Sequence, residues 1–370
     1  MKKRILIFMH DFRGGGAEKV AILLANGFVK ADCSVEIVVL KNEGPMKSLL
    51  SDSVVVSSLN CERVSKSLFK LMKFLLKKEY DLLISHMTHV NTIATLAAIA
   101  TRSTNKLCLV EHNMMSKNYK IQSSNSVKLA YLSTKLLYRF CDKIVAVSTG
   151  VKDSVTRFTG VSREKVNVIF NPVVDPVAMK NKFLSVTHQK RCLHPFFEQG
   201  VPVIVGIGSL TEQKNFELLI ESVPHLTKTR DCRVLILGEG PLREKLQNRI
   251  DALGLSSRVD LVGFVKDPAE YLILSSLFVL SSKWEGLPTV VIEALATGTK
   301  ILATDCPSGP NEILVNGKYG ELVALDASPE NFADKIQVAL NTKVQKELLF
   351  ERAEDFSITA STKKYLELIG

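Results

Sequence analysis

The sequence has little of what marks secreted, zinc-binding or membrane-spanning proteins. Its seven cysteines are odd in number, lie far apart and never form C-x-x-C, so we predict neither a disulfide framework nor a zinc site. The longest nearly apolar stretches, residues 90–100 and 271–280, fall well short of the roughly 20 residues that a membrane-spanning helix needs. We therefore expect no transmembrane segment.

The chain begins with Met-Lys-Lys-Arg-Ile-Leu-Ile-Phe-Met, which resembles the start of a signal peptide. His10, Asp11 and Arg13 end this apolar run after about five residues, whereas the apolar region of a signal peptide needs roughly 7 to 15. We therefore expect a protein of the cytoplasm, where thiols stay reduced.

Acidic residues are scarce in the first half of the chain. Residues 1–180 carry 27 Lys and Arg against 14 Asp and Glu, whereas residues 181–370 carry 21 against 24. A basic half commonly faces a polyanion, either nucleic acid or an anionic membrane, although a merely solvated basic surface remains an alternative. With one tryptophan, no zinc finger and no RNA-binding motif, a nucleic-acid binder rests on basicity alone, so we expect no nucleic-acid partner.

Aliphatic residues, by contrast, are plentiful and follow a repeated pattern. With 370 residues, of which 46% are hydrophobic and 23% charged, the chain has the size and composition of two globular domains. Short apolar runs typical of buried parallel strands alternate with helical stretches, which predicts a doubly wound α/β fold in each half. The expected strands are residues 4–9, 34–40, 82–85, 107–110, 143–147, 203–207, 233–237, 259–262, 277–280 and 300–303.

The two predicted domains are separated near Asp175-Pro176. We expect an N-terminal domain over residues 1–175, an irregular basic linker over 176–200 and a C-terminal domain over 201–370. A last helical pattern, over 361–369, is able to pack back on the N-terminal domain. Two facing doubly wound domains form a cleft at the carboxyl ends of their strands, so the chemistry should lie on the loops that follow those strands.

The segment S-S-K-W-E-G-L-P-T-V-V-I-E-A, from Ser281, follows one predicted strand. Pro288 stands where a helix would begin, so the free amides of Thr289 and Val290 should form an anion site. Glu293 lies one turn beyond Thr289 on the same face, where a carboxylate suits sugar hydroxyls such as a ribose diol. The alternative is that Glu285 and Glu293 are solvated charges at a helix end.

Three further loops carry candidate residues. Lys214 ends G-I-G-S-L-T-E-Q-K, a run that is neither a Walker A loop nor G-x-G-x-x-G, and it is placed to reach a phosphate. The loop Gly14-Gly15-Gly16-Ala17-Glu18 would admit a phosphate or an acceptor sugar, unless it is simply a flexible turn. His112 directly follows a predicted strand, at the edge of the cleft, and its alternative role is structural.

Together these residues resemble the retaining glycosyltransferases of family four, which have the GT-B fold of two facing Rossmann-like domains. The resemblance covers nearly the whole chain and rests on seven features in the same order. They are the G-G-G-A-E loop, E-H at 111–112, G-x-L-x-x-x-K-N at 208–215, G-E-G-P at 238–241, G-F-V at 263–265, E-x7-E at Glu285 and Glu293, and S-G-P-N-E-I at 308–313.

The resemblance implies a role for each motif. The catalytic residues would be Glu285, Lys214 and His112, and His112 would lie beside the donor sugar. The donor nucleotide and sugar would contact Gly208, Ser209, Lys214, Gly238, Gly263, Phe264, Val265, Gly286, Leu287, Pro288, Thr289, Val290 and Glu293. The acceptor or phosphate loop would comprise Gly14, Gly15, Gly16 and Glu18.

Two departures affect the chemistry. The family usually has an arginine where this chain has Ser209, so one expected phosphate-binding cation is missing, and Arg13 or another basic residue would have to replace it. No two aspartates are separated by a single residue, so the D-x-D element that holds a metal in the other large glycosyltransferase fold is absent. We therefore expect no cofactor and no metal requirement, with cations and a helix terminus stabilising the leaving diphosphate.

A basic amphipathic helix is predicted over residues 63–77. Arg63 and four lysines, at 66, 70, 73 and 77, form one face. The other face comprises Val64, Leu68, Leu71, Met72, Leu75 and Leu76, with Phe69 and Phe74 at its flanks. Either the lysine face rests on anionic lipid or the helix is an internal one with solvated lysines. We favour the first, and with it a peripheral location at the inner face of the cytoplasmic membrane.

The resemblance implies transfer of a hexose or N-acetylhexosamine from a UDP-sugar to a lipid-linked glycan acceptor in bacterial surface polysaccharide or glycoconjugate biosynthesis. A sugar-nucleotide epimerase of the same fold is the nearest alternative, and a non-catalytic basic nucleotide- or nucleic-acid-binding protein is another. An NAD-dependent dehydrogenase would need G-x-G-x-x-G after its first strand, and residues 14–19 do not supply it.

Overall fold

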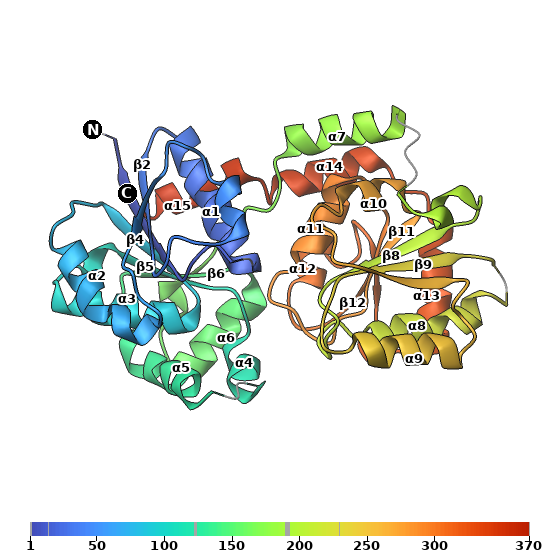
Figure 1. The fold of residues 1–370 in the computed structure, drawn as a ribbon, viewed down its shortest axis with the longest axis horizontal. Coiled ribbons are helices and arrows are strands. Elements are labelled where there is room, and N and C mark those ends of the chain that lie inside the picture. The colour runs from blue at the N-terminus through green and yellow to red at the C-terminus, as the bar shows by residue number, and fades with distance from the viewer. Residues whose placement is uncertain (1, 14, 122–123, 189–192, 229, 370) are drawn as a thin grey trace. The chain divides into compact units, whose positions relative to one another are not determined.

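The computed structural model describes residues 2–13, 15–121, 124–188, 193–228 and 230–369. The chain divides into two compact units (Figure 1). Unit 1 comprises Met1–Val173 together with Phe356–Gly370, and unit 2 comprises Val174–Asp355. No helix within the described residues is both long and apolar enough to cross a bilayer.

Unit 1 is built on a parallel sheet, with seven strands among the described residues in the order β3-β2-β1-β4-β5-β6-β7. Its central strands are buried on both faces, which explains their nearly continuous aliphatic sequences. The strands are β1 Arg4–Met9, β2 Ser34–Val39, β3 Val55–Ser58, β4 Leu82–His86, β5 Leu107–Glu111, β6 Lys143–Ala146 and β7 Val166–Val168.

Helices cover both faces of this sheet. They are α1 Gly16–Lys30, α2 Leu68–Leu75, α3 Thr88–Ala100, α4 Met115–Ile121, α5 Asn125–Leu137, α6 Thr149–Thr159 and α15 Ile358–Glu367, with 3₁₀ turns η1 Pro45–Leu49, η2 Val64–Ser67, η3 Thr104–Lys106 and η4 Arg163–Lys165. The strand order runs away from β1 in both directions, so right-handed crossovers put α1 on one face and α2, α3, α5 and α6 on the other. Contacts agree, because α1 packs against α15, whereas α2 packs against α3 and α3 against α5.

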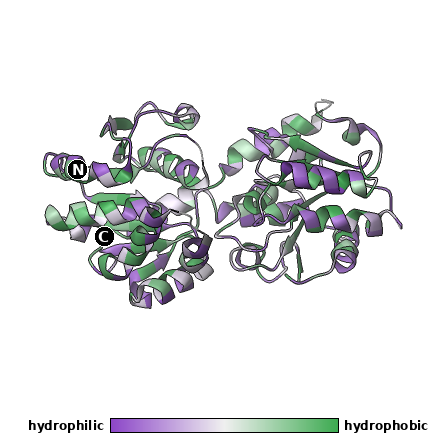
Figure 2. Ribbon diagram, turned by 60° about the horizontal axis from the view of Figure 1, so that its bottom comes forward, coloured by the Kyte–Doolittle hydropathy of each residue, from purple (hydrophilic) through white to green (hydrophobic). Residues whose placement is uncertain are grey.

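Unit 2 repeats the design with six strands among its described residues, in the order β10-β9-β8-β11-β12-β13. The strands are β8 Val203–Ile207, β9 Arg233–Leu237, β10 Val259–Gly263, β11 Leu277–Leu280, β12 Ile301–Thr304 and β13 Glu321–Val323. The helices are α7 Pro176–His188, α8 Phe216–Leu226, α9 Arg243–Ala252, α10 Ala269–Leu274, α11 Thr289–Ala296, α12 Pro310–Leu314, α13 Pro329–Asn341 and α14 Lys346–Glu354, with the 3₁₀ turn η5 Pro195–Glu198. In both units the strands are largely hydrophobic and the helices alternate in hydropathy (Figure 2).

The ten predicted strands are all present, each within one residue of its expected bounds. The doubly wound α/β prediction is therefore confirmed for both halves. Residues 166–170 are also strand-like in sequence and contain β7, whereas the sequence pattern missed β3, an edge strand with exposed Val55, and the three-residue β13. Neither has the continuous buried run by which the other strands were recognised.

The irregular linker expected over 176–200 is instead helical over Pro176–His188. Asp175 and Pro176 begin α7, because the Asp175 carboxylate accepts from the Ala178 amide at 3.1 Å and proline suits the first helical position. Phe183 packs edge-on against Phe350 of α14, with ring centroids 5.7 Å apart. This segment is therefore part of unit 2.

The last residues of the chain return to unit 1. The backbone amide of Val173 donates to the carbonyl of Phe356 at 3.0 Å, and the Ser361 hydroxyl donates to the carbonyl of Phe170 at 2.8 Å. The rings of Phe170 and Phe356 lie 4.9 Å apart, with Phe356 fully buried. These contacts fix α15 beside α1.

Candidate active site

An ion pair joins two loops at the carboxyl edge of the unit 2 sheet. The Lys214 ammonium lies 2.6 Å from Oε1 of Glu285, and the two side chains are only 17% and 7% exposed. Ser282 donates to the same oxygen at 2.6 Å, and Gln213 donates to Oε2 at 3.3 Å. The Glu285 carboxylate is therefore held at both oxygens. An anion that binds Lys214 would share the positive charge of the Lys214 ammonium with the Glu285 carboxylate.

The loop after β11 rests on the loop after β12. The amide of Glu285 donates to the carbonyl of Pro307 at 2.9 Å, and the amide of Ser308 donates back to the carbonyl of Glu285 at 3.1 Å. The Ser308 hydroxyl also donates to the carbonyl of Gly286 at 3.0 Å. Gly309 has φ +99°, and a Cβ there would lie 2.6 Å from Pro288, so only glycine permits this contact.

Glycines end three adjacent strands of the same sheet. Gly208, Gly238 and Gly263 stand at the carboxyl ends of β8, β9 and β10, joined by backbone hydrogen bonds from Gly208 to Leu237 at 3.0 Å and from Gly238 to Gly263 at 2.8 Å. A Cβ at Gly238 would lie 1.9 Å from the Gly208 carbonyl oxygen, and a Cβ at Gly208 would lie 2.9 Å from the Lys214 stem. The edge is therefore bare backbone, over which Lys214 lies.

The first turn of α11 opens at this edge. Pro288 precedes the helix. The backbone amides of Thr289 and Val290 lie in its first turn, where the helix has no preceding carbonyl to accept their hydrogen bonds. Such amides and the helix dipole favour an anion. Thr289 and Glu293 are four residues apart and both half-buried, so they share one helix face.

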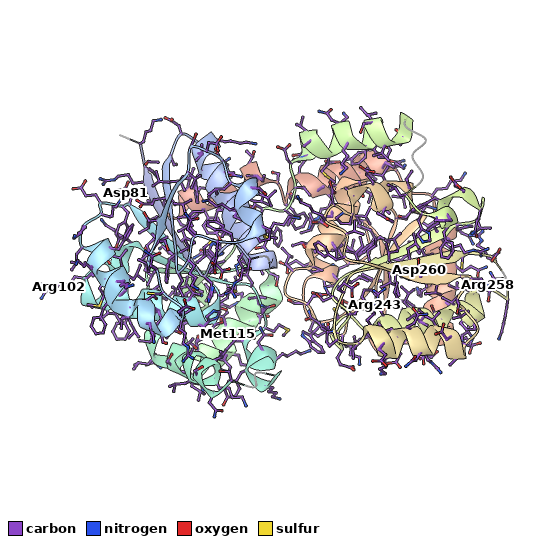
Figure 3. All side chains as sticks on the ribbon, viewed as in Figure 1. Asp81, Arg102, Met115, Arg243, Arg258 and Asp260 are labelled. Carbon is purple, nitrogen blue, oxygen red and sulfur yellow. The ribbon has the colours of Figure 1, made fainter. Side chains whose placement is uncertain are left out.

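Other cations at this edge are already paired within unit 2. Lys283 lies 3.4 Å from Glu212, and Arg243 (labelled in Figure 3) donates to Glu239 at 2.9 Å and to the carbonyl of Leu261 at 2.8 Å. Ser209 is exposed, and Phe264 lies exposed after β10. Within the described part of the chain, no three His, Cys, Asp or Glu side chains lie close enough together to hold a metal ion.

Unit 1 presents a histidine pair at the carboxyl edge of its own sheet. Nδ1 of His86, at the end of β4, lies 3.0 Å from Nε2 of His112, just after β5, and the rings stack with centroids 5.2 Å apart. Burial lowers the pKa of His112 to about 4. Burial and the neighbouring His112 hold the pKa of His86 well below its usual value of 6.5. Both rings are therefore neutral at pH 7.

The pair has a preferred tautomer. Nε2 of His86 is buried and has no hydrogen-bond partner among the described residues. An orphaned buried N–H is rarer than an orphaned acceptor, so this nitrogen carries no proton and Nδ1 of His86 does. His86 then donates to Nε2 of His112, which leaves the proton of His112 on Nδ1.

A buried carboxylate anchors the backbone next to His112. Glu111 accepts from Thr88 at 2.8 Å, from Asn91 at 2.9 Å and from the Tyr138 hydroxyl. Burial raises the pKa of Glu111, and these hydrogen bonds oppose the rise. The network fixes the end of β5 and with it the position of His112.

The glycine loop of unit 1 carries its own carboxylate. Gly14 lies outside the described residues, Gly15 precedes α1 and Gly16 begins it. A Cβ at Gly15 would lie 2.4 Å from the carboxylate of Glu18, so Glu18 folds back over the helix terminus. A phosphate at this terminus would have to displace Glu18. Arg13 donates to Asp11 at 2.5 Å, so the expected replacement cation is itself paired.

Two family models match the chain in succession. Residues 14–175 match the model described as Glycosyltransferase Family 4, and residues 195–360 match the model described as Glycosyl transferases group 1. The chain belongs to glycosyltransferase family 4. The resemblance inferred from its motifs is thereby confirmed, and the protein is an enzyme, a glycosyltransferase.

Curated relatives of this glycosyltransferase span most of its length. An uncharacterized glycosyltransferase of Methanocaldococcus jannaschii is 29% identical, with 83% of each chain covered. The N-acetylgalactosamine-N,N'-diacetylbacillosaminyl-diphospho-undecaprenol 4-alpha-N-acetylgalactosaminyltransferase of Campylobacter jejuni is 26% identical over 93% of this chain and 92% of its own. The UDP-Gal:alpha-D-GlcNAc-diphosphoundecaprenol alpha-1,3-galactosyltransferase of Escherichia coli is 28% identical over 78% and 76%.

Solved structures share the fold of the glycosyltransferase. The lipopolysaccharide outer core galactosyltransferase WaaB, in its apo form, has a TM-score of 0.73 and 19% identity, with 99% of both chains covered. Anabaena HepE in complex with UDP and glucose has a TM-score of 0.74 and 18% identity, covering 99% of this chain and 98% of its own. The predicted GT-B fold is confirmed.

The structure gathers most of the predicted donor residues of the glycosyltransferase at one edge of unit 2, and it gives a role to three residues that lie within the quoted motifs but were not named as candidates. Gln213, Ser282 and Ser308 hold Glu285 and its loop. His86, in unit 1, was also missed. A signal for it existed, because β4 and β5 are adjacent, β4 ends in His86, and His112 directly follows β5 at the same edge of the sheet.

Proposed function

We propose that this glycosyltransferase transfers a hexose or N-acetylhexosamine from a UDP-sugar to a lipid-linked glycan acceptor, with retention of configuration and without a metal ion. The named relatives support the acceptor class, because the Campylobacter and E. coli enzymes carry diphospho-undecaprenol in their names. The UDP in the HepE complex supports the nucleotide. The corresponding process is bacterial surface polysaccharide or glycoconjugate assembly, at the inner face of the cytoplasmic membrane.

The Lys214–Glu285 pair is the observation that carries the proposal. Lys214 and the amides of Thr289 and Val290 supply positive charge and N–H donors for a diphosphate, and Glu293 lies on the same helix face for the ribose hydroxyls. Gly208 leaves room for the Lys214 stem, and Gly238 leaves room for the Gly208 carbonyl, so these glycines allow Lys214 to lie at this edge. Glu285, with both oxygens already directed by neighbours, is placed to orient the sugar hydroxyls.

The chemical step balances without a protein nucleophile or a metal. The acceptor oxygen forms a bond to the anomeric carbon on the face from which the diphosphate leaves, and the bond from that carbon to the diphosphate oxygen breaks. The acceptor proton passes to the departing phosphate oxygen. Lys214 and the α11 terminus stabilise the charge on the diphosphate, and neutral His112 donates a hydrogen bond from Nδ1 to the donor sugar.

Charge on unit 1 supports a membrane-associated acceptor. Lys66, Lys70, Lys73 and Lys77 are exposed along η2 and α2. Lys70 also donates to the carbonyls of Leu59 and Asn60, at 2.9 Å each. The helical segment is shorter than expected, and Leu71 and Leu75 pack inward, as an amphipathic helix requires.

Product analysis tests the proposed function. Purified enzyme is incubated with four UDP-sugars (glucose, galactose and their N-acetyl-amino forms), with and without a short-chain lipid diphosphate glycan. We expect UDP release and a longer glycan only when both substrates are present. Conversion of free UDP-sugar into its epimer without acceptor would establish the epimerase alternative instead.

A further inference from the structure

The α5 helix of unit 1 exposes a row of large apolar side chains. Leu129, Leu132 and Leu136 are 67%, 42% and 61% exposed, and Phe140, just past the helix end, is 49% exposed. The spacings of three, four and four residues place them on one helix face. Tyr131, Thr134 and Leu137 form the buried face, and α5 packs against α3 and α6. The outer row is therefore not part of the unit's core.

Cations line this row, and acids are missing from it. Lys128, Lys135 and Arg139 alternate with the apolar residues, and no Asp or Glu occurs between Glu111 and Asp142. The Lys135 ammonium lies 5.6 Å from the centre of the Phe158 ring, so its stem stays close to the helix surface. A surface that joins exposed leucines to uncompensated cations matches an anionic lipid headgroup layer above acyl chains.

The neighbouring helices extend the same surface. Between α2 and α5 lies α3, whose sequence THVNTIATLAAIA contains no Lys, Arg, Asp or Glu, and which packs against both. Phe69 on α2 and Leu76 just after it are exposed between lysines, although the sequence pattern placed them on or beside the apolar face. One layer of three helices thus combines exposed apolar residues with basic ones and carries no acid within α2, α3 or α5.

We propose that the outer face of α5, continued by α3 and α2, inserts its apolar row into an anionic lipid bilayer. A second copy of the chain fits this surface less well than a bilayer does, because a two-fold interface would bring the cations of both copies together. A lipid-linked acceptor lies in such a bilayer, so this membrane contact would bring the enzyme to its acceptor, a purpose that rests on the proposed function. The binding itself requires no catalysis.

Co-sedimentation of the full chain with vesicles tests the surface. Vesicles of phosphatidylcholine with phosphatidylglycerol are compared with phosphatidylcholine alone, using wild type, Leu129→Ser/Leu136→Ser and the matched control Val338→Ser/Leu348→Ser, which changes two exposed residues of unit 2. We expect binding to anionic vesicles only, weakened about tenfold or more by the α5 pair and unchanged by the control. Lys128→Gln/Arg139→Gln should also weaken binding and reduce its salt dependence.

Each remaining outcome decides a separate question. Wild-type binding by the Leu129→Ser/Leu136→Ser variant, with an unchanged melting temperature, would overturn the proposal. A wild-type dimer that this variant converts to a monomer would assign the row to a second copy and overturn it as well. Transfer to a short-chain acceptor should be the same in variant and wild type, and its absence in both would count against the proposed function alone.

Discussion

Lys214 and Glu285 should be the most sensitive pair of residues in unit 2. Lys214→Ala removes the cation expected to meet the diphosphate, and Glu285→Gln keeps the shape of the side chain but removes its charge and one of its two acceptor oxygens. We expect each to lower kcat by about 10²-fold or more, because charge stabilisation in the transition state is lost. Steady-state kinetics measure this, with Lys283→Ala as the control, since Lys283 pairs with Glu212 on the exposed surface.

If both variants kept a near-normal kcat, the assignment of Lys214 and Glu285 to the donor site would be wrong. Melting temperatures are needed beside the rates, because Lys214→Ala leaves a largely buried carboxylate without its ion-pair partner. Glu285→Gln leaves no unpaired carboxylate, although Lys214 loses its ion-pair partner, so a rate defect in this variant has a chemical cause only if the melting temperature is unchanged.

His86 is expected to act through His112 as a positioning residue. Its Nδ1 proton fixes the tautomer of His112, so His86→Ala should lower kcat about tenfold with little change in KM, and His86→Asn should restore part of the loss by donating from its amide. Nitrogen NMR of ring-labelled protein reports which nitrogen of His112 is protonated. A spectrum with the His112 proton on Nε2 in wild type would refute the tautomer assignment.

Among the elements, the carboxyl ends of β4 and β5 and the start of α3 should respond to acid. Burial lowers the pKa of His112 and of His89 to about 4, against an ordinary value of 6.5. The unfolded chain therefore binds protons between pH 6.5 and 4 that the folded chain does not, at roughly 1.4 kcal/mol per unit of pKa difference for a fully expressed shift. The stability from these neutral histidines is complete above pH 6.5 and is lost as the pH falls toward 4.

Thermal unfolding from pH 7.5 to 4.5 measures this dependence. We expect the melting temperature to fall below pH 6.5, and the fall to be smaller in His89→Gln, which cannot take up a proton. An equal fall in wild type and His89→Gln would mean that other groups, such as the paired carboxylates, control the acid response.

Other elements show which parts of the fold could be predicted from the sequence and which could not. Buried parallel strands such as β1, β8 and β11 are recognised in the sequence by their unbroken aliphatic runs. The loops after β8 and β11 carry predicted donor residues. Asp175-Pro176 was misread, because an N-cap followed by proline is also typical of a turn, and only the packing of α7 on unit 2 decides between them. Contacts between residues far apart in sequence, such as the hydrogen bond from Gln213 to the Glu285 carboxylate 72 positions away, can be known only from the fold.

At the scale of the whole molecule, the chain is more basic in unit 1 than in unit 2. Unit 1 carries 28 Lys and Arg against 14 Asp and Glu, a net charge of +14, and unit 2 carries 20 against 24, a net charge of −4. The edge proposed to bind the nucleotide therefore lies in the unit whose net charge repels an anion, so under this proposal the affinity for UDP would come from local groups, namely Lys214 and the α11 terminus. We therefore expect the affinity for UDP to depend only weakly on salt concentration, because such local, partly buried contacts are screened less than exposed charges.

The whole enzyme should work without a divalent metal. Lys214 and the α11 amides would supply the stabilisation that a metal gives elsewhere, so transfer in excess EDTA should proceed at the rate seen with Mg²⁺. UDP should likewise raise the melting temperature equally with and without Mg²⁺, because it binds the native state, whereas NAD should leave it unchanged. Proton NMR of the product should show an α linkage from an α donor. Activity that EDTA abolishes and Mn²⁺ restores would refute metal independence, and a β product would refute retention while leaving the donor site in place.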